Sequence, residues 1–381
     1  MNITINEARN LILYAQGFYN EFSEPIDVLN FLGTIQLDSI NVLARNQELV
    51  IYSRFGNYDT DKLYKTVYDQ NAFEYWGHSA SWMPMSYYKL FLHRIRLLQQ
   101  HGRSATTVNK QVREEYSEYY KVVMDLIKEK EFVSSSDFKE VKRSGQGWWN
   151  FKPAKRVLED LFDQGIITVS NRDKNFNRIY CLSEKYITWH KNKTDIGIRD
   201  SVKELMWLGI NRLGIATQRE TADYFRCYKW SEPWKEAFEE LLEEKKIEEV
   251  YIENKKTKYY LAKELFDKYS NENISTNMLH PVLISPLDNL IWDRKRVHNL
   301  FNFNYKVEFY KKVENREYGY FVLPLLSRGG IRGRADLKFD RGNNVLNVLG
   351  FWLENEGTSD EMEQALINLK TFLKADKLEY F

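Results

Sequence analysis

The chain has 381 residues, of which 43% are hydrophobic and 29% are charged, and this composition excludes an intrinsically disordered protein. The formal net charge is +1, so the strong overall basicity of many DNA-binding proteins is absent. No apolar run approaches membrane-spanning length and only two cysteines occur, which argues against a transmembrane segment, a C-x-x-C metal site or a disulfide framework and predicts a cytoplasmic protein.

The N-terminal third of the chain is predicted to be mainly helical, because apolar residues recur there at helical spacing. The predicted helices cover residues 6–20, 25–33, 39–52, 87–100 and 114–130. Helix, helix, turn, helix is the frame of a helix-turn-helix or winged-helix unit. Residues 78–88 contain Pro84 and many aromatic side chains, and we expect them to be irregular.

Two later stretches share the order helix, strand, polar turn, strand. In the first, a helix over 152–165 precedes strands at 166–170 and 178–182, with the polar turn 171–174 between them. In the second, helices beginning at 217 and 234 precede strands at 247–252 and 258–261. This order predicts tandem winged helices, in which the polar turn is the wing.

Beyond a polar linker the C-terminal part becomes strand-like. Strand pairs are predicted at 304–310 with 318–324 and at 331–340 with 344–351, followed by a helix over 361–375. The expected fold is therefore α+β, with tandem winged-helix (helix-turn-helix) domains followed by a C-terminal antiparallel β-barrel-like domain. The predicted domains cover residues 1–125, 126–192, 193–270 and 278–381.

The strongest candidate for a catalytic segment consists of Gln36, Leu37 and Asp38. In an extended segment, residues i and i+2 point to the same side, so Gln36 and Asp38 would converge while Leu37 anchors the segment. An amide that holds a water beside a carboxylate that takes its proton is a minimal hydrolytic pair. Periodicity alone favours a structural alternative, in which Asp38 caps a helix that begins at Ser39 and Gln36 is an ordinary surface amide.

The order of several motifs resembles one family over nearly the whole chain. The matching segments are residues 36–45, 52–54, 73–81, 148–155, 285–296, 318–325 and 333–338. Together they resemble the AlkZ/YcaQ-type winged-helix DNA glycosylases of bacteria, which unhook interstrand crosslinks. The resemblance implies that Gln36 and Asp38 are the catalytic Gln-apolar-Asp motif. That branch looks broader than the Gln-apolar-Gln branch, which resembles self-resistance enzymes of toxin producers.

The resemblance also implies the substrate and the reaction. A guanine alkylated at N7 is cationic, so its glycosidic bond is already weakened and a carboxylate can stabilise the oxocarbenium character of the sugar. The motif offers no lysine for a Schiff base, so hydrolysis without strand cleavage is expected. The expected partner is double-stranded DNA with alkylated or crosslinked guanine, bound by a monomer without a metal or organic cofactor.

Candidate DNA contacts are basic or aromatic side chains near the motif, on the first predicted wing and in a glycine-containing stretch. Arg45 and Arg54 are either ion-paired helix residues or phosphate contacts, and His78 is either a packed residue, which we favour, or a contact near the lesion. The wing candidates are Arg172, Lys174 and Arg178. Arg328, Arg332 and Arg334 are expected to form a flexible basic loop, with simple solvation as the alternative. Trp148 and Trp149 are expected to be core residues.

A non-enzymatic winged-helix DNA-binding protein or transcription regulator is the rival interpretation, since tandem winged helices alone support it equally well. Gln36 with Asp38 discriminates between the two, because a regulator has no need of such a pair. A nuclease is a weaker alternative, since no cluster of metal-binding carboxylates stands out.

Overall fold

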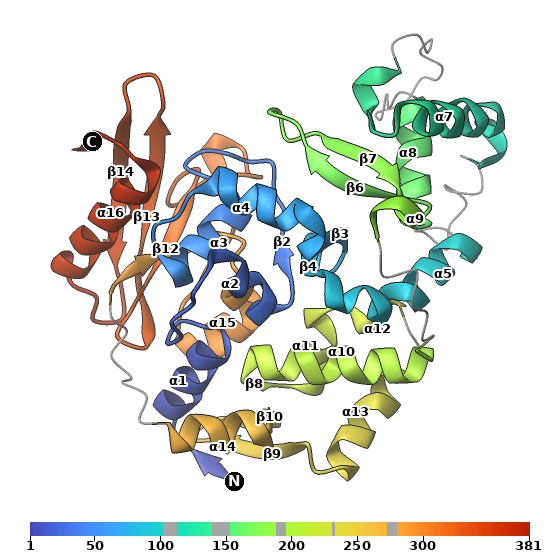
Figure 1. The fold of residues 1–381 in the computed structure, drawn as a ribbon. Helices are drawn as coiled ribbons and strands as arrows, with labels where there is room; N and C mark the ends of the chain where they lie inside the picture. Colours follow the sequence, from blue (N-terminus) through green and yellow to red (C-terminus); the bar gives the residue numbers. More distant parts are fainter. Residues whose placement is uncertain (102–112, 139–152, 188–195, 231–232, 273–279) are drawn as a thin grey trace. The chain divides into compact units, whose positions relative to one another are not determined.

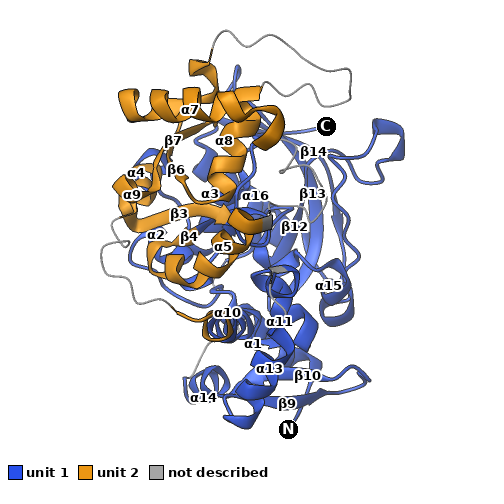
Figure 2. Ribbon diagram, turned by 90° about the vertical axis from the view of Figure 1, so that its right-hand side faces the viewer, with its two compact units in different colours: residues 1–63, 76–82, 202–381 blue, residues 64–75, 83–201 orange. Residues whose placement is uncertain are grey.

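The computed structural model describes residues 1–101, 113–138, 153–187, 196–230, 233–272 and 280–381. The chain forms two compact units, which are coloured separately in Figure 2. Unit 1 comprises residues 1–63, 76–82 and 202–381, and unit 2 comprises residues 64–75 and 83–201. The four predicted domains are a finer division, which stays a prediction. Among the described residues, no helix is long and apolar enough to cross a membrane.

Unit 1 begins with the helices that the apolar spacing predicts. Helix α1 (Ile5–Ala15) starts with a capping box between Thr4 and Glu7. Helix α2 (Pro25–Leu32) has proline at its first position and ends at Gly33, whose φ of 74° lies in the left-handed region that favours glycine. Both helices are seen in blue in Figure 1.

The third predicted helix is wrong at its start. Helix α3 covers Asn46–Phe55, whereas residues 37–45 form neither helix nor strand. The backbone N–H of Arg45 donates to the Glu48 carboxylate at 2.8 Å, and this contact caps α3 there. Helix α4 follows at Thr60–Thr66.

A four-stranded sheet of unit 1 contains the second pair of predicted wing strands. Its order is β1-β9-β10-β8, with β1 at Asn2–Ile3, β8 at Ile215–Ala216, β9 at Ile247–Ile252 and β10 at Tyr259–Ala262. The helices around it are α10 (Ile198–Leu213), α11 (Gln218–Tyr224), α12 (Cys227–Trp230), α13 (Trp234–Glu243) and α14 (Lys263–Asn271). The predicted capping box of Thr217 and Glu220 is present at the start of α11.

The C-terminal sheet of unit 1 has five strands in the order β11-β12-β13-β14-β15. They are β11 (Val282–Leu283), β12 (Val322–Ser327), β13 (Gly330–Asp340), β14 (Val345–Leu353) and β15 (Lys377–Tyr380). Helix α16 (Ser359–Leu373) packs on β11 and β12. The predicted pair at 331–340 and 344–351 is confirmed by β13 and β14. Because β11 and β15 are the two edges of this order, the sheet is open and the expected barrel closure is not seen.

The predicted hairpin of residues 304–310 with 318–324 is wrong, because the first segment contains no strand. The Glu308 carboxylate accepts the backbone N–H groups of Glu317, Tyr318 and Gly319. A side chain therefore satisfies N–H groups that a strand ladder was expected to satisfy. The 3-10 turn η5 (Asn289–Ile291) and helix α15 (Arg294–Phe301) precede residue 304. The 3-10 turn η6 (Val313–Asn315) lies between the two segments of the predicted hairpin.

Unit 2 contains the first pair of predicted wing strands. Its sheet has the order β5-β7-β6, with β5 at Val133–Ser134, β6 at Ile167–Arg172 and β7 at Arg178–Leu182. Its helices are α5 (Leu92–His101), α7 (Ser117–Lys130), α8 (Pro153–Asp163) and α9 (Ser183–Tyr186). The predicted residues Trp148 and Trp149 lie outside the described residues.

The segments where the chain passes between the units include strands β3 (Ala72–Trp76) and β4 (Ala80–Pro84) and a 3-10 helix η2 (Met85–Phe91). The expectation of an irregular stretch at 78–88 is therefore wrong for most of its length. Pro84 is the last residue of β4.

Candidate active site

Gln36 lies in a short strand, which gives the motif the extended conformation that the sequence predicts. Strand β2 (Ile35–Gln36) pairs antiparallel with β4, with Gln36 opposite Ser81. The pairing continues through the Leu37 N–H, which donates to the Ala80 carbonyl at 2.8 Å. Leu37 is buried, whereas Gln36 and Asp38 on either side of it are partly exposed. This alternation is what an extended segment produces when its middle residue anchors it.

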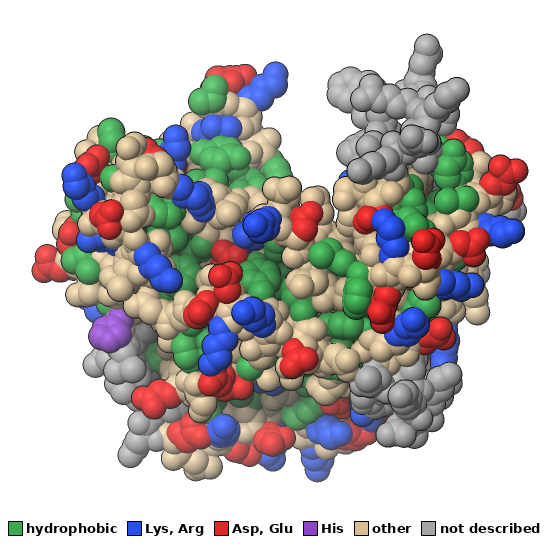
Figure 3. All heavy atoms as spheres, turned by 45° about the horizontal axis from the view of Figure 1, so that its top comes forward, with side chains coloured by type: hydrophobic (Ala, Val, Ile, Leu, Met, Phe, Trp, Pro, Cys, Tyr) green, Lys and Arg blue, Asp and Glu red, His purple; other side chains and the backbone are tan. Residues whose placement is uncertain are grey.

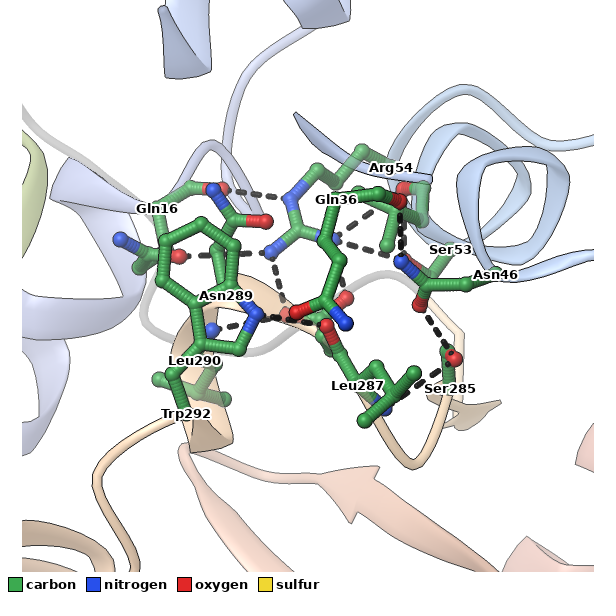
Figure 4. A network of polar contacts seen from close by, with 12 residues as sticks. Gln16, Gln36, Asn46, Ser53, Arg54, Ser285, Leu287, Asn289, Leu290 and Trp292 are labelled. Carbon is green, nitrogen blue, oxygen red and sulfur yellow. Dashed lines mark hydrogen bonds and ion pairs between the residues drawn. The ribbon is translucent and has the colours of Figure 1, made fainter. Parts of the chain in front are cut away.

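The Gln36 backbone is held by side chains, while its amide group remains available. The Asn46 Nδ2 donates to the Gln36 carbonyl at 2.6 Å, and the Asn46 Oδ1 accepts from the Ser285 Oγ at 2.6 Å. In Figure 4 the Gln36 side chain extends toward Leu287 and Trp292, and no dashed line ends on its amide. Within the described ranges this amide has no hydrogen-bond partner, so its donors and acceptor can orient a water or a substrate group.

Asp38 follows in a tight turn, and its carboxylate has no cationic partner among the residues that the structure describes. Its Oδ1 accepts from the Ile40 N–H at 2.7 Å, and its own N–H donates to the Gln47 Oε1 at 3.2 Å. The helix-cap alternative is wrong, because the next helix begins only at Asn46. The contact with Ile40 is instead the short-range turn that aspartate often makes.

Burial sets the acidity of Asp38. It raises the pKa of Asp38 above its ordinary value of 3.8, against the opposing effect of the Ile40 and Ser39 N–H groups. The carboxylate lines a small pocket together with Ile40, Asn46, Ser285, Pro286, Leu287, Phe309 and Phe321. A half-buried carboxylate of raised pKa in such a pocket is suited to accept a proton from water or to stabilise a developing cation.

Arg54 is placed inside unit 1, close to the motif. Its Nη1 and Nη2 contact the two Asp288 oxygens at 2.7 and 2.9 Å, and both side chains are fully buried. Its Nε donates to the Gln16 carbonyl at 2.7 Å, and its guanidinium lies 4.0 Å from the centre of the Phe18 ring. This is the ion-paired alternative that the sequence left open, and in this position the charge does not face solvent.

Arg45 and His78 are also engaged with neighbouring residues. The Arg45 Nη1 lies 3.4 Å from the Glu48 Oε1. His78 stacks on Trp292 with ring centres 4.2 Å apart, and the Arg226 Nη2 lies 3.0 Å from its Nε2. Burial, followed by the charge of Arg226, lowers the pKa of His78 to about 4, so the ring is neutral at pH 7. Its packing matches the structural alternative that the sequence favoured.

The predicted first wing, the segment around the turn between β6 and β7 in unit 2, has one exposed basic residue among its three candidates. The Arg172 Nε and Nη2 contact the two Glu74 oxygens at 2.7 Å each, and the Arg178 Nε lies 3.6 Å from the same carboxylate. Lys174 is exposed. Two of the three candidate charges are thus paired inside unit 2, and Lys174 is the exposed one.

The expected flexible basic loop is wrong, because its residues belong to a β-hairpin. Arg328 and Gly329 form the turn between β12 and β13, and Arg332 and Arg334 lie in β13. Arg328 pairs with Glu361 at 2.7 Å and Arg334 pairs with Glu354 at 2.6 Å. The Arg332 Nη1 bonds the Asn355 carbonyl. Their charges are used in ion pairs and hydrogen bonds with helix α16 and with the segment that follows β14.

The surface drawn in Figure 3 interleaves acidic and basic side chains. The wide basic face of many DNA-binding proteins is not seen on this side. Among the described residues, no group of three or more His, Cys, Asp or Glu side chains is arranged to hold a metal ion.

Sequence reasoning missed the supports of the motif. Asn46 and Gln47 hold the backbone of Gln36 and Asp38, and Asp288 neutralises Arg54. Two signals were present. Asn46 and Gln47 directly follow the matching segment 36–45, and Asp288 lies within the matching segment 285–296. Periodicity cannot supply such contacts, because they join residues up to 234 positions apart.

Comparison with known proteins places these residues in a family. The model of a family described as DNA glycosylase AlkZ-like matches residues 29–372. The structure is also similar to Streptomyces sahachiroi DNA glycosylase AlkZ, with 15% sequence identity, a TM-score of 0.64 and complete coverage of both chains. At this identity the structural likeness establishes a shared fold.

Proposed function

The chain belongs to the AlkZ-like DNA glycosylase family, and from that premise we propose that it is a monofunctional glycosylase that hydrolyses the N-glycosidic bond of N7-alkylated guanine, including guanine in interstrand crosslinks. The observation that carries the proposal is the Asp38 carboxylate. It is half-buried, lacks a cationic partner among the described residues and follows two residues after the unbonded amide of Gln36. A carboxylate with a purely structural role would be expected to have its charge satisfied.

In the proposed reaction the bond between C1′ and N9 breaks first in the transition state. Its electron pair goes to N9, so the positively charged base leaves as neutral N7-alkylguanine and needs little acid assistance. The sugar gains oxocarbenium character, which the nearby negative charge of Asp38 stabilises. The oxygen of a water held by Gln36 forms the new bond to C1′, and its proton goes to Asp38.

The products are the free base and an intact strand with an abasic site. No lysine has been identified at the motif to form a Schiff base, so the proposal includes no β-elimination. Each of the two effects of Asp38 would contribute a few kcal/mol, since a positioned general base is worth about 10²- to 10⁴-fold in rate. Proton transfer and charge stabilisation by one carboxylate are two uses of the same ionised group.

The crosslinked substrate limits the form of the site. A guanine tied to the opposite strand cannot be turned out fully into a deep pocket. Gln36 and Asp38 are partly exposed, which supports action on a base that remains near the duplex. A buried carboxylate such as Asp288 would not be accessible to such a lesion.

The proposed DNA-binding elements are winged helices. Strands β5, β6 and β7 with helices α7 and α8 in unit 2, and strands β8, β9 and β10 with helices α10 to α13, have the helix and strand order that this fold requires. Lys174 on the first wing is the proposed phosphate contact. The protein would act on double-stranded DNA as a monomer.

The test uses one duplex with a single N7-methylguanine and a second with a nitrogen-mustard crosslink. Wild type, Gln36→Ala and Asp38→Asn are incubated with each, and abasic sites are revealed with alkali. Base release by the wild type, strand breaks only after alkali, and loss of release in Asp38→Asn with DNA binding retained are expected. Tight binding without release on either duplex would contradict the proposal and favour a DNA-binding regulator.

A further inference from the structure

The loop that follows Glu308 meets the candidate active site of unit 1. Phe309 and Asp38 line the same small pocket. Phe309 is buried, and its ring centre lies 6.0 Å from that of Phe321 and 4.4 Å from that of Tyr310. The next residue, Tyr310, leaves 73% of its surface exposed. An exposed aromatic ring is thus anchored through Phe309 to the wall of the Asp38 pocket.

This loop is held by polar contacts at both ends. The Glu308 carboxylate accepts from the backbone N–H groups of Glu317, Tyr318 and Gly319 at 3.0, 2.8 and 3.2 Å, and from the Lys311 Nζ at 2.6 Å. Burial acts against ionisation of Glu308, but these contacts hold its pKa at about 2. The carboxylate therefore stays ionised, and its contacts stay formed, over the whole range in which the protein would work.

A second clamp lies inside the loop. The Arg316 Nε and Nη2 both donate to the Lys311 carbonyl, at 3.1 and 3.0 Å. These contacts restrain the backbone of the loop around Tyr310, so less backbone freedom would be lost when a ligand binds.

Asp38 acts electrostatically on Tyr310. Burial, and next the negative charge of Asp38, raise the pKa of the Tyr310 hydroxyl. Single exposed aromatic side chains are common and need no explanation. Tyr310 differs because its loop is held by the contacts of Glu308 and Arg316, and because its ring packs on Phe309, a lining residue of the Asp38 pocket.

We propose that Tyr310 contacts the substrate, with its ring against the positively charged alkylated base while Asp38 and Gln36 act at the sugar. The proposal rests on the proposed function. An aromatic face attracts a cation, and N7-alkylguanine is cationic whereas guanine is neutral. Tyr310 would therefore add selective binding of damaged guanine to the chemical selectivity that the weakened glycosidic bond already provides.

The charge of the base also determines which kinetic parameter, KM or kcat, the loss of Tyr310 should change. The attraction of the ring for the base is present in the bound substrate and falls as the base becomes neutral during bond cleavage. Tyr310 would thus stabilise the ground state at least as much as the transition state, so its loss should raise KM and leave kcat nearly unchanged.

The test compares Tyr310→Ala, Tyr310→Phe and the control Tyr380→Ala, which removes another exposed tyrosine, in strand β15. On the N7-methylguanine duplex, Tyr310→Ala is expected to raise KM about 10-fold with kcat within about 3-fold. Tyr310→Phe keeps the ring and should keep the wild-type KM, and Tyr380→Ala should match the wild type. An unchanged KM in Tyr310→Ala, or an equal rise in Tyr310→Phe, would overturn the proposal.

A binding measurement separates this proposal from the proposed function. Asp38→Asn and the double variant Asp38→Asn/Tyr310→Ala are titrated with matched duplexes that contain N7-methylguanine or guanine. The single variant should prefer the methylated duplex, and the double variant should lose about 10-fold of that preference. An undiminished preference in the double variant would overturn the role of Tyr310, even if the wild type released no base and the proposed reaction were itself wrong.

Discussion

Asp38 and Asp288 are two aspartates of unit 1 with opposite surroundings. Asp288 is fully buried, yet each of its oxygens contacts a guanidinium nitrogen of Arg54. Asp38 is only half-buried, yet among the described residues its charge meets backbone N–H groups alone. The more buried carboxylate is the better satisfied one. The difference separates a charge that holds the protein together from one that is kept available for chemistry.

The buried Arg54–Asp288 ion pair is predicted to stabilise the folded protein. Replacing Arg54 with Met should lower the free energy of unfolding by about 3–5 kcal/mol, because Asp288 would then be a buried charge without a partner. Urea unfolding measures the change. The control is Lys62→Met, which breaks an exposed pair with Glu24 and should cost at most about 1 kcal/mol.

Equal stability of Arg54→Met and the wild type would contradict the structural role of the pair. If Arg54 contacted a phosphate instead, the variant would keep its stability and weaken DNA binding, with a salt dependence that falls by about one unit of slope.

Gln36→Ala should lower base release by about 10- to 100-fold while leaving unfolding unchanged, since the side chain amide holds nothing within the described structure. Asn46→Ala is the matched comparison, because it removes a residue with a structural role. Asn46 Nδ2 bonds the Gln36 carbonyl and its Oδ1 bonds Ser285, so that variant should lose stability as well as activity. A destabilised Gln36→Ala protein would place Gln36 among the structural residues.

The stability of Asp38→Asn has a predicted sign. A carboxyl whose pKa is raised by folding binds its proton more tightly in the folded state. The stability that this tighter proton binding by Asp38 contributes is present at low pH. It is lost as the pH rises from 3.8, the ordinary pKa, through the raised pKa of the folded state. At pH 7 Asp38→Asn should unfold at the same temperature as the wild type or higher. A clear loss of stability at pH 7 would indicate a structural carboxylate.

The pH dependence of the reaction follows from the same shift. If Asp38 must be ionised, kcat should rise with pH through the raised pKa of Asp38, so the acid limb should lie above pH 3.8. A profile of single-turnover rates, limited to pH values at which the protein remains folded, measures this limb. If the acid limb of the profile remains at the same pH in Asp38→Asn, the limb reports the ionisation of another group.

Lys174 is expected to give the smallest effect. Lys174 is the exposed candidate on the proposed first wing. Lys174→Ala should weaken DNA binding slightly and reduce the salt slope by about one, without changing stability. Arg172→Ala is the matched contrast, since loss of its two contacts with Glu74 should destabilise unit 2. An unchanged salt slope in Lys174→Ala would exclude the proposed phosphate contact.

The sequence predicted features that depend on neighbouring residues. The apolar spacing of α1 and α2 and the strand pair β13 and β14 are confirmed, because their signals lie within one element or one hairpin. The extended form of the Gln36 segment is also seen. The catalytic roles of Gln36 and Asp38 stay a prediction that came from the family resemblance.

The sequence failed where a side chain, and not the backbone, is the partner of a backbone N–H group or of a charge. The start of α3 and the absence of a strand at 304–310 depend on the carboxylates of Glu48 and Glu308, which satisfy backbone N–H groups directly. The pairing of Arg172 with Glu74 joins residues 98 positions apart. Charge patterns show which residues are basic, but only the fold shows which charges are already neutralised.

The central claim is that Asp38 is the carboxylate that acts on the glycosidic bond. The most direct measurement is the single-turnover release of N7-methylguanine from duplex DNA by Asp38→Asn, beside wild type and the exposed control Asp360→Asn. The account predicts a loss of about 100-fold or more in Asp38→Asn alone, with DNA affinity and unfolding temperature retained. Release by Asp38→Asn at the wild-type rate would contradict it.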